Sequence, residues 1–239
     1  MKILKLTAFA AAIVCCASCQ KTPKYTAPQP VVIPKIVILG SSSAAGEGAN
    51  PLDSAWAFRL QLTINQNGTK ATFTNLAYAG YVTYQAMPTG YTVAGRPAPD
   101  TARNITKALS LHPTLVMISF PSNDIADNYT DDEIMSNFAI MTHMLDSAKV
   151  QYIVFGTQPR NFPDSTQRMR LKTLDDKIVA AYPVNVNDFL AALSTSSYDI
   201  NPIYSAGDGI HLNNSGHCLI MTRTMQHPIF IQVTGVVPK

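Results

Sequence analysis

Two segments near opposite ends of the chain carry residue types that could together perform nucleophilic chemistry. An apolar run stops at Gly40 and is followed by three serines, Ser41 to Ser43. Far along the chain, Asp208 precedes His211 by three residues. Residues with this spacing face the same way in a turn, so the carboxylate can hold one imidazole nitrogen while the other accepts a serine proton. The pattern predicts the orienting half of a Ser-His-Asp triad, although D-x-x-H alone is more often a chance surface pair.

Two further segments carry groups that could stabilise a negatively charged oxygen. Asn123 follows an apolar run in FPSNDIADN, and Gly80 follows another in NLAYAGYVT. A side-chain amide aimed into a pocket can stabilise an oxyanion, and a glycine lets its N–H approach a ligand without a Cβ in the way. The alternatives are ordinary ones, because asparagine often caps a turn or a helix and glycine often completes a turn.

These residues follow the apolar runs of a predicted α/β domain. The predicted strands cover residues 31–39, 69–78, 113–120, 150–157 and 183–188, and the predicted helices cover 54–66, 99–111, 131–149, 165–182 and, as the final helix, 213–226. Strands that are apolar on both faces and alternate with long helices indicate a three-layer α/β/α sandwich with a central, mostly parallel sheet. Ligands bind such folds beyond the carboxyl ends of the strands, where the loops converge.

Two of the convergent loops carry residues that we expect to contact substrate. Tyr91 and Arg96 lie in the Gly- and Pro-rich segment 86–100, and Gln158 and Arg160 lie in GTQPRNF after the fourth predicted strand. Long loops of this kind near a site often act as lids or binding loops. The alternative for either arginine is that it ties down its own loop.

Taken together, four loops resemble the SGNH hydrolases, which are also called GDSL esterases and lipases. In the order of the family's four blocks, the matches are Gly40-Ser41-Ser42-Ser43 with Ser42 in the nucleophile's position, Gly80, Asn123, and Asp208-Gly209-Ile210-His211. The first block lacks its usual aspartate and leucine, and the third has Pro121-Ser122 where glycines are usual. No G-x-S-x-G occurs, which argues against the nucleophile elbow of α/β-hydrolases.

The resemblance implies a serine esterase of the SGNH type that needs no metal and no organic cofactor. His211 would take the Ser42 proton, Asp208 would orient the imidazole, and the Ser42 and Gly80 N–H groups with the Asn123 amide would form the oxyanion hole. A metal site at Asp208, His211 and His217 is the weaker alternative, because this spacing matches no common ligand pattern. We expect His217 to pack in the first turns of the final helix instead.

The expected substrate is a small ester or an acylated glycan. Polar loops, and the lack of a continuous apolar lid, favour short acyl groups, above all acetyl, on carbohydrate. One alternative is a lipid-directed acylhydrolase, lysophospholipase or thioesterase, and another is a non-catalytic cell-surface module that binds glycan on the same scaffold. Nucleic acid is not an expected partner, because the formal charge of +3 falls to +1 without Lys2 and Lys5.

The N-terminal residues have the layout of an export signal. Two lysines precede an apolar stretch, and residues 16–19 read C-A-S-C, which resembles the lipobox of bacterial lipoproteins. We predict a signal peptide over residues 1–18, lipidation of Cys19, a proline-rich tether over 19–30 and an SGNH hydrolase-type domain over 31–239. The protein would then be an exported bacterial lipoprotein, anchored to a membrane by its N-terminal lipid, at the periplasmic face or the cell surface.

Replacement of Cys19 by serine tests this anchor. Because the thiol is the acylated group, we expect the Cys19→Ser protein to move from the membrane fraction to the soluble fraction of cells. Retention of the mature variant in membranes would contradict the prediction.

Overall fold

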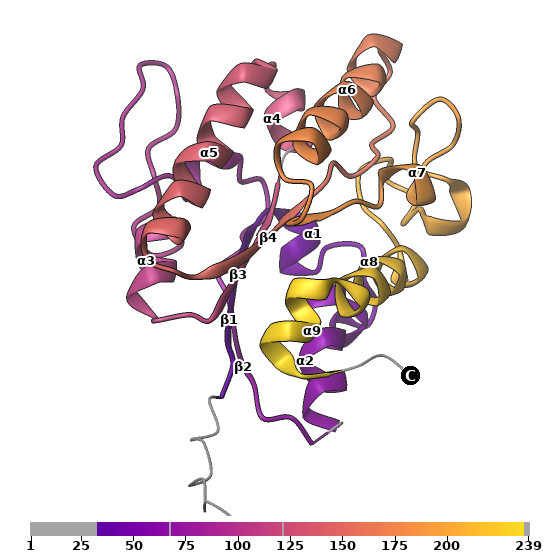
Figure 1. Cartoon of the computed structure of the whole chain (residues 1–239). Coiled ribbons are helices and arrows are strands. Elements are labelled where there is room, and N and C mark those ends of the chain that lie inside the picture. Colours follow the sequence, from indigo (N-terminus) through magenta and orange to yellow (C-terminus); the bar gives the residue numbers. More distant parts are fainter. Residues whose placement is uncertain (1–32, 67, 121, 237–239) are drawn as a thin grey trace, which may run out of the picture. The chain divides into compact units, whose positions relative to one another are not determined.

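A sheet of five parallel strands forms the centre of the protein in the computed structural model, which describes residues 33–66, 68–120 and 122–236 (Figure 1). The strand order is β2-β1-β3-β4-β5. The strands are β1 (Lys35–Gly40), β2 (Thr72–Asn75), β3 (Leu115–Ser119), β4 (Gln151–Phe155) and β5 (Val186–Asn187). All four strand pairs are parallel, so all five carboxyl ends lie at one edge.

The central strands are buried on both faces. In β1, Val37 and Leu39 belong to one hydrophobic cluster while Ile36 and Ile38 belong to the other. Alternate side chains of a strand point to opposite faces, and an all-parallel sheet needs helices on both. The β-branched residues of this strand also favour extended backbone.

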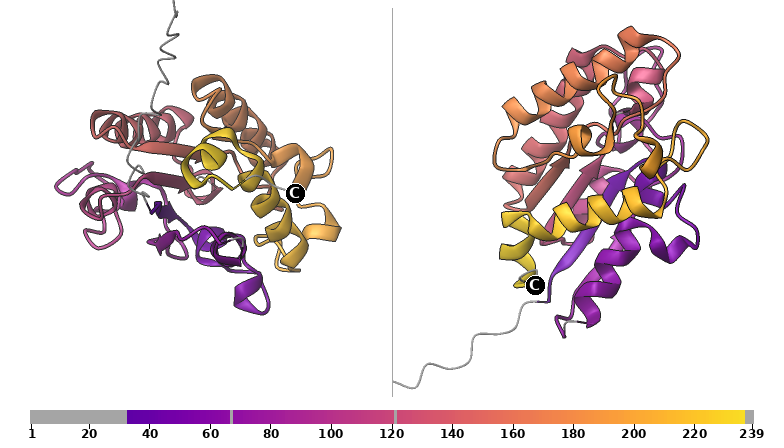
Figure 2. Two further views of the ribbon diagram at one scale, coloured as in Figure 1. Left: turned by 60° about the horizontal axis from the view of Figure 1, so that its bottom comes forward. Right: turned by 90° about the vertical axis from the view of Figure 1, so that its right-hand side faces the viewer.

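Helices cover both faces of the sheet and complete the predicted three-layer α/β/α sandwich (Figure 2). The helices α3 (Ile105–Ser110), α5 (Asp131–Ser147) and α6 (Ser165–Ala181) bury their apolar residues on one face, and α2 (Trp56–Gln66), α8 (Asn214–Gln226) and α9 (Pro228–Thr234) on the other. Short helices α1 (Ser42–Ala45), α4 (Ser122–Ala126) and α7 (Leu190–Leu193) follow strands β1, β3 and β5.

Several predicted elements differ from the structure, some of them for clear local reasons. The helix predicted from residue 99 begins at Ile105, because Asn104 caps it by accepting a hydrogen bond from the Lys107 N–H. The predicted loop after β3 contains α4. The helix α8 is not the final one, since Pro228 occupies the first turn of α9, a position where its missing N–H costs nothing.

The export signal, Cys19 and the tether lie outside the described residues and stay predictions. Within the described residues, the structure contains no helix with the length and apolar character needed to cross a bilayer. Cys218 on α8 is partly buried and forms no disulfide with another described residue.

Candidate active site

The candidate nucleophile lies at the start of a short helix directly beyond the central strand. Ser42 is the first residue of α1, and Ser41 is the N-cap, with extended backbone and no capping side-chain bond. Ser42 is therefore not a capping serine. A Cβ at Gly40 would lie 2.6 Å from the Ala44 Cβ and 2.7 Å from the Ser119 oxygen, so only glycine allows this tight strand-to-helix turn.

The candidate acid–base pair is formed within one loop. The Oδ2 of Asp208 lies 2.6 Å from Nδ1 of His211, and its Oδ1 accepts hydrogen bonds from the N–H groups of Ile210 and His211. Burial raises the pKa of Asp208, but these hydrogen bonds together outweigh it and lower the pKa to about 2. The ionised carboxylate therefore requires the proton of a neutral His211 on Nδ1, which leaves Nε2 as the acceptor.

Close backbone packing brings the histidine loop against the loop that follows the candidate nucleophile. Gly48 has φ +88°, and a Cβ there would lie 2.2 Å from the Leu212 oxygen and 2.8 Å from the His211 Cβ. Within the described residues, Ser42 Oγ and His211 Nε2 do not form a hydrogen bond. Such catalytic bonds are often long before substrate binds and tighten in its presence.

Gln158 connects the same two loops through its side chain. The Ser43 hydroxyl donates to Oε1 of Gln158, and Nε2 of Gln158 donates to the Ile210 oxygen at 2.9 Å. The side chain follows β4 and Gln158 is only 7% exposed. Because both ends of the amide are engaged, Gln158 fixes the nucleophile helix relative to the histidine loop.

His217 lies in the first turns of α8, as predicted, and its side chain is buried. Its Nδ1 accepts from the Trp56 N–H at 3.3 Å and its Nε2 lies 3.0 Å from the Glu47 oxygen, so the ring braces the loop between α1 and α2. Burial lowers its pKa, which keeps the imidazole neutral. No group of three potential metal ligands occurs among the described residues.

The candidate oxyanion donors Ser42, Gly80 and Asn123 follow β1, β2 and β3 at the same edge of the sheet. Neither the Ser42 N–H nor the Gly80 N–H donates to a protein group within the described chain. Gly80 has φ +81°, a conformation that favours glycine. The Asn123 Nδ2 donates to the Tyr81 oxygen and its Oδ1 accepts from Arg160, both at 3.0 Å. The second hydrogen on Nδ2 has no partner among the described residues, so it can donate to an oxyanion. The bond from Arg160 to Oδ1 fixes the orientation of the amide.

A buried carboxyl group that sequence reasoning missed holds these oxyanion loops together. Asp124 is fully buried and accepts hydrogen bonds from the Thr83 N–H at 3.0 Å and the Thr83 hydroxyl at 2.5 Å. Asn137 on α5 donates to the same hydroxyl. Burial raises the pKa of Asp124 to about 7 despite these bonds. The one available signal was its position directly after Asn123.

The four predicted substrate contacts are all engaged within the protein. Besides the bonds of Gln158 and Arg160, Arg96 pairs with Glu133 at 2.6 Å and lies over the Tyr129 ring, and Tyr91 stacks against Tyr84. The contacts of Arg96 favour the alternative that it ties down its own loop. Contact of these four residues with substrate stays a prediction.

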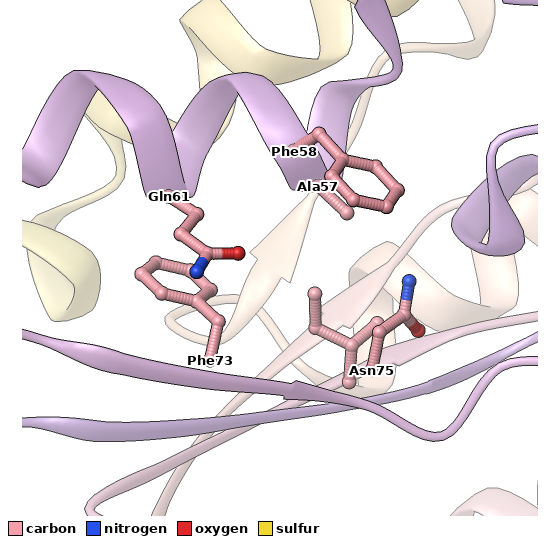
Figure 3. Close-up of a pocket in the computed structure, with 6 residues that line it drawn as sticks. Ala57, Phe58, Gln61, Phe73 and Asn75 are labelled. Atoms are coloured by element: carbon pink, nitrogen blue, oxygen red, sulfur yellow. The ribbon is translucent and has the colours of Figure 1, made fainter. Parts of the chain in front are cut away.

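A separate pocket opens between α2 and the edge strand β2 (Figure 3). Its lining is mainly apolar and consists of Ile38, Ala57, Phe58, Gln61, Phe73 and Asn75. The Asn75 side chain also donates to the Ala44 oxygen at 2.7 Å and so links β2 to the nucleophile helix α1. None of Ser42, Asp208 and His211 lines this pocket.

Comparison with known proteins agrees with the fold and the arrangement of these loops. Residues 38–219 match the GDSL-like Lipase/Acylhydrolase family, so the chain belongs to this family. It is therefore a carboxylic ester hydrolase, of a family in which a Ser-His-Asp triad is typical. A comparison with curated proteins gave no match.

Several solved structures share the fold at low sequence identity. A GDSL-like lipase from Bacteroides thetaiotaomicron VPI-5482 is 19% identical, with a TM-score of 0.60 over 80% of this chain and 86% of that one. A lipase/acylhydrolase from Enterococcus faecalis is 21% identical, with a TM-score of 0.61 over 85% and 96%. A two-domain esterase active on acetylated mannans is 16% identical, with a TM-score of 0.55 over 85% of this chain and 50% of that one.

Proposed function

We propose that the protein hydrolyses short-chain esters, above all acetyl esters on carbohydrate, through an acyl-enzyme at Ser42. The observation that carries the proposal is the openness of a polar site. The Asp208 side chain is 47% exposed and that of His211 19%, and the polar side chains of Asn123 and Arg160, which bond to each other, follow the neighbouring strands β3 and β4. An ester on a bulky, hydrated sugar can reach a shallow site, whereas a long acyl chain needs an enclosed apolar channel.

In the proposed mechanism, Ser42 Oγ attacks the ester carbonyl while Nε2 of His211 takes its proton. The Asp208 carboxylate stabilises the imidazolium, and the N–H groups of Ser42 and Gly80 with the Asn123 amide hold the oxyanion. Collapse of the tetrahedral intermediate breaks the bond to the alcohol oxygen, which receives the proton from His211. Water then attacks the acyl-enzyme in the same way, releasing the acid and restoring Ser42.

The similarity to a two-domain esterase active on acetylated mannans supports acetylated carbohydrate as the substrate, because that protein shares the fold over 85% of this chain. The contrary alternative is a lipid-directed acylhydrolase. The apolar pocket between α2 and β2 does not favour it, since no triad residue lines that pocket.

Acyl-chain preference tests the proposal. We expect kcat/KM of the purified protein to fall by about tenfold or more from p-nitrophenyl acetate to the octanoate, because each poorly accommodated methylene weakens transition-state binding. Acetate release from acetylated oligosaccharides should accompany it.

Two other outcomes of the same assay would contradict the proposal. Faster cleavage of octanoate than of acetate would overturn it in favour of a lipid-directed enzyme. Binding of glycan without cleavage of any ester would instead indicate a non-catalytic module.

A further inference from the structure

An exposed aromatic side chain lies beside the candidate oxyanion hole. Tyr78 follows β2 and precedes Gly80 by two residues, and it is 52% exposed. Its N–H donates to the Gly40 oxygen at 3.2 Å, at the point where β1 ends and the turn to Ser42 begins. Tyr78 is therefore fixed at the edge of the sheet that carries the candidate nucleophile.

The ring of Tyr78 is held in place by two neighbours. The guanidinium carbon of Arg103 lies 5.1 Å from the ring centroid, and the ring of Tyr81 lies 5.1 Å away at an angle of 46°. Arg103 is itself tied to the backbone, because it donates to the Ala77 oxygen at 3.3 Å. The exposed part of the ring is thus a supported surface, which lowers the entropy that a ligand would lose on binding.

Tyr81 joins this surface to the candidate oxyanion hole and to a charged rim. Its carbonyl oxygen accepts from the Asn123 amide at 3.0 Å, and its hydroxyl donates to Oδ2 of Asp100 at 2.5 Å. Burial raises the pKa of Tyr81 to about 12, so the phenol keeps its proton at all working pH values. Oδ2 of Asp100 lies 3.9 Å from Nε of Arg103, so a carboxylate and a guanidinium group lie beside the rings of Tyr78 and Tyr81.

We propose that Tyr78 stacks on the sugar ring that carries the scissile ester, with Asp100 and Arg103 facing that sugar's hydroxyl groups. A sugar ring presents an apolar C–H face edged by hydroxyls, and a supported aromatic ring edged by charged groups complements both. An acyl chain would instead need a continuous apolar groove, which a single ring with a charged rim does not offer. This inference rests on the proposed function and adds the residue that selects its alcohol half.

Kinetics on two kinds of acetyl ester test the subsite. The full-length protein would be assayed on acetylated xylo- and manno-oligosaccharides and on ethyl acetate, which has no ring to stack. We expect Tyr78→Ala to raise KM for the acetylated oligosaccharides by about tenfold, a loss of roughly 1.4 kcal/mol of binding, and to leave both constants on ethyl acetate within about twofold. Tyr78→Phe keeps the ring and should behave as wild type.

A second exposed aromatic residue provides the matched control for sugar stacking at Tyr78. Phe58 lies on α2, and Phe58→Ala should leave KM for the oligosaccharides unchanged. An unchanged KM for Tyr78→Ala would overturn the subsite, and so would an equal loss on ethyl acetate, which would assign Tyr78 to support of the oxyanion loop. A wild-type protein that cleaves ethyl acetate but no acetylated saccharide would overturn the proposed substrate class itself, before any variant is compared.

Discussion

Replacement of Ser42 by alanine is expected to lower kcat for p-nitrophenyl acetate by about 10⁴-fold or more, because the variant cannot form an acyl-enzyme. Ser42 Oγ is the proposed attacking atom, and the side chain lies at the start of α1 with no capping role. The fold should be unaffected, since the Ser42 hydroxyl has no capping role and alanine is a strong helix former. Steady-state kinetics and a thermal melt would be recorded on the same preparation.

The flanking serines provide matched controls. Ser41→Ala removes a hydroxyl that forms no capping bond and should retain activity close to wild type. Ser43→Ala breaks the hydrogen bond to Gln158 and should give an intermediate loss, because the histidine loop is then held less firmly. If Ser41→Ala or Ser43→Ala were as inactive as Ser42→Ala, or if Ser42→Ala kept its turnover, the assignment of the nucleophile would be wrong.

Replacement of Asn123 by alanine is expected to lower kcat by about 10²- to 10³-fold with little change in KM. The amide hydrogen that is not bound to Tyr81 is the proposed donor to the oxyanion, which exists only in the transition state and the intermediates. Kinetics on p-nitrophenyl acetate would give both constants, and thermal melting would report any loss of the Tyr81 and Arg160 contacts.

An aspartate at the same position removes the donor while keeping the shape of the side chain and its contact with Arg160. Asn123→Asp keeps an oxygen to accept from Arg160 but has no hydrogen to donate when ionised. It should therefore be at least as slow as Asn123→Ala, and it should melt below wild type, because its second oxygen replaces the donor to the Tyr81 carbonyl. A fast Asn123→Asp variant would show that the amide is a structural link between α4 and the Tyr81 loop, without a part in catalysis.

The elements that sequence reasoning predicted are those with long, regular apolar patterns. The strands β1 and β3 read as continuous apolar runs because both of their faces are buried, and α5 and α6 have strong N-terminal caps at Thr130 and Asp164. Helices α4, α7 and α9 are too short to show a helical period. Their starts depend on local bonds, such as that between His227 and the Ile229 N–H.

The same distinction holds for the candidate site. The Asp208–His211 contact was predictable because it forms within one turn, and the spacing alone brings the groups together. The links made by Gln158 and Asp124 join residues far apart in the chain, so no local pattern reveals them. Gln158 was predicted to contact substrate from the position of its loop, and its bonds to Ser43 and Ile210 could not be predicted from that position.

The role of Ser42 as the nucleophile is tested most directly by the site of covalent labelling with diethyl p-nitrophenyl phosphate. An activated serine displaces p-nitrophenol and keeps a diethylphosphoryl group, so release of p-nitrophenol counts the reacting residues and peptide mass spectrometry locates them. About one label per chain is expected, on Ser42, with loss of esterase activity in the same proportion, and no label in Ser42→Ala. Stoichiometric labelling of another residue, or full activity of a protein labelled at Ser42, would contradict it.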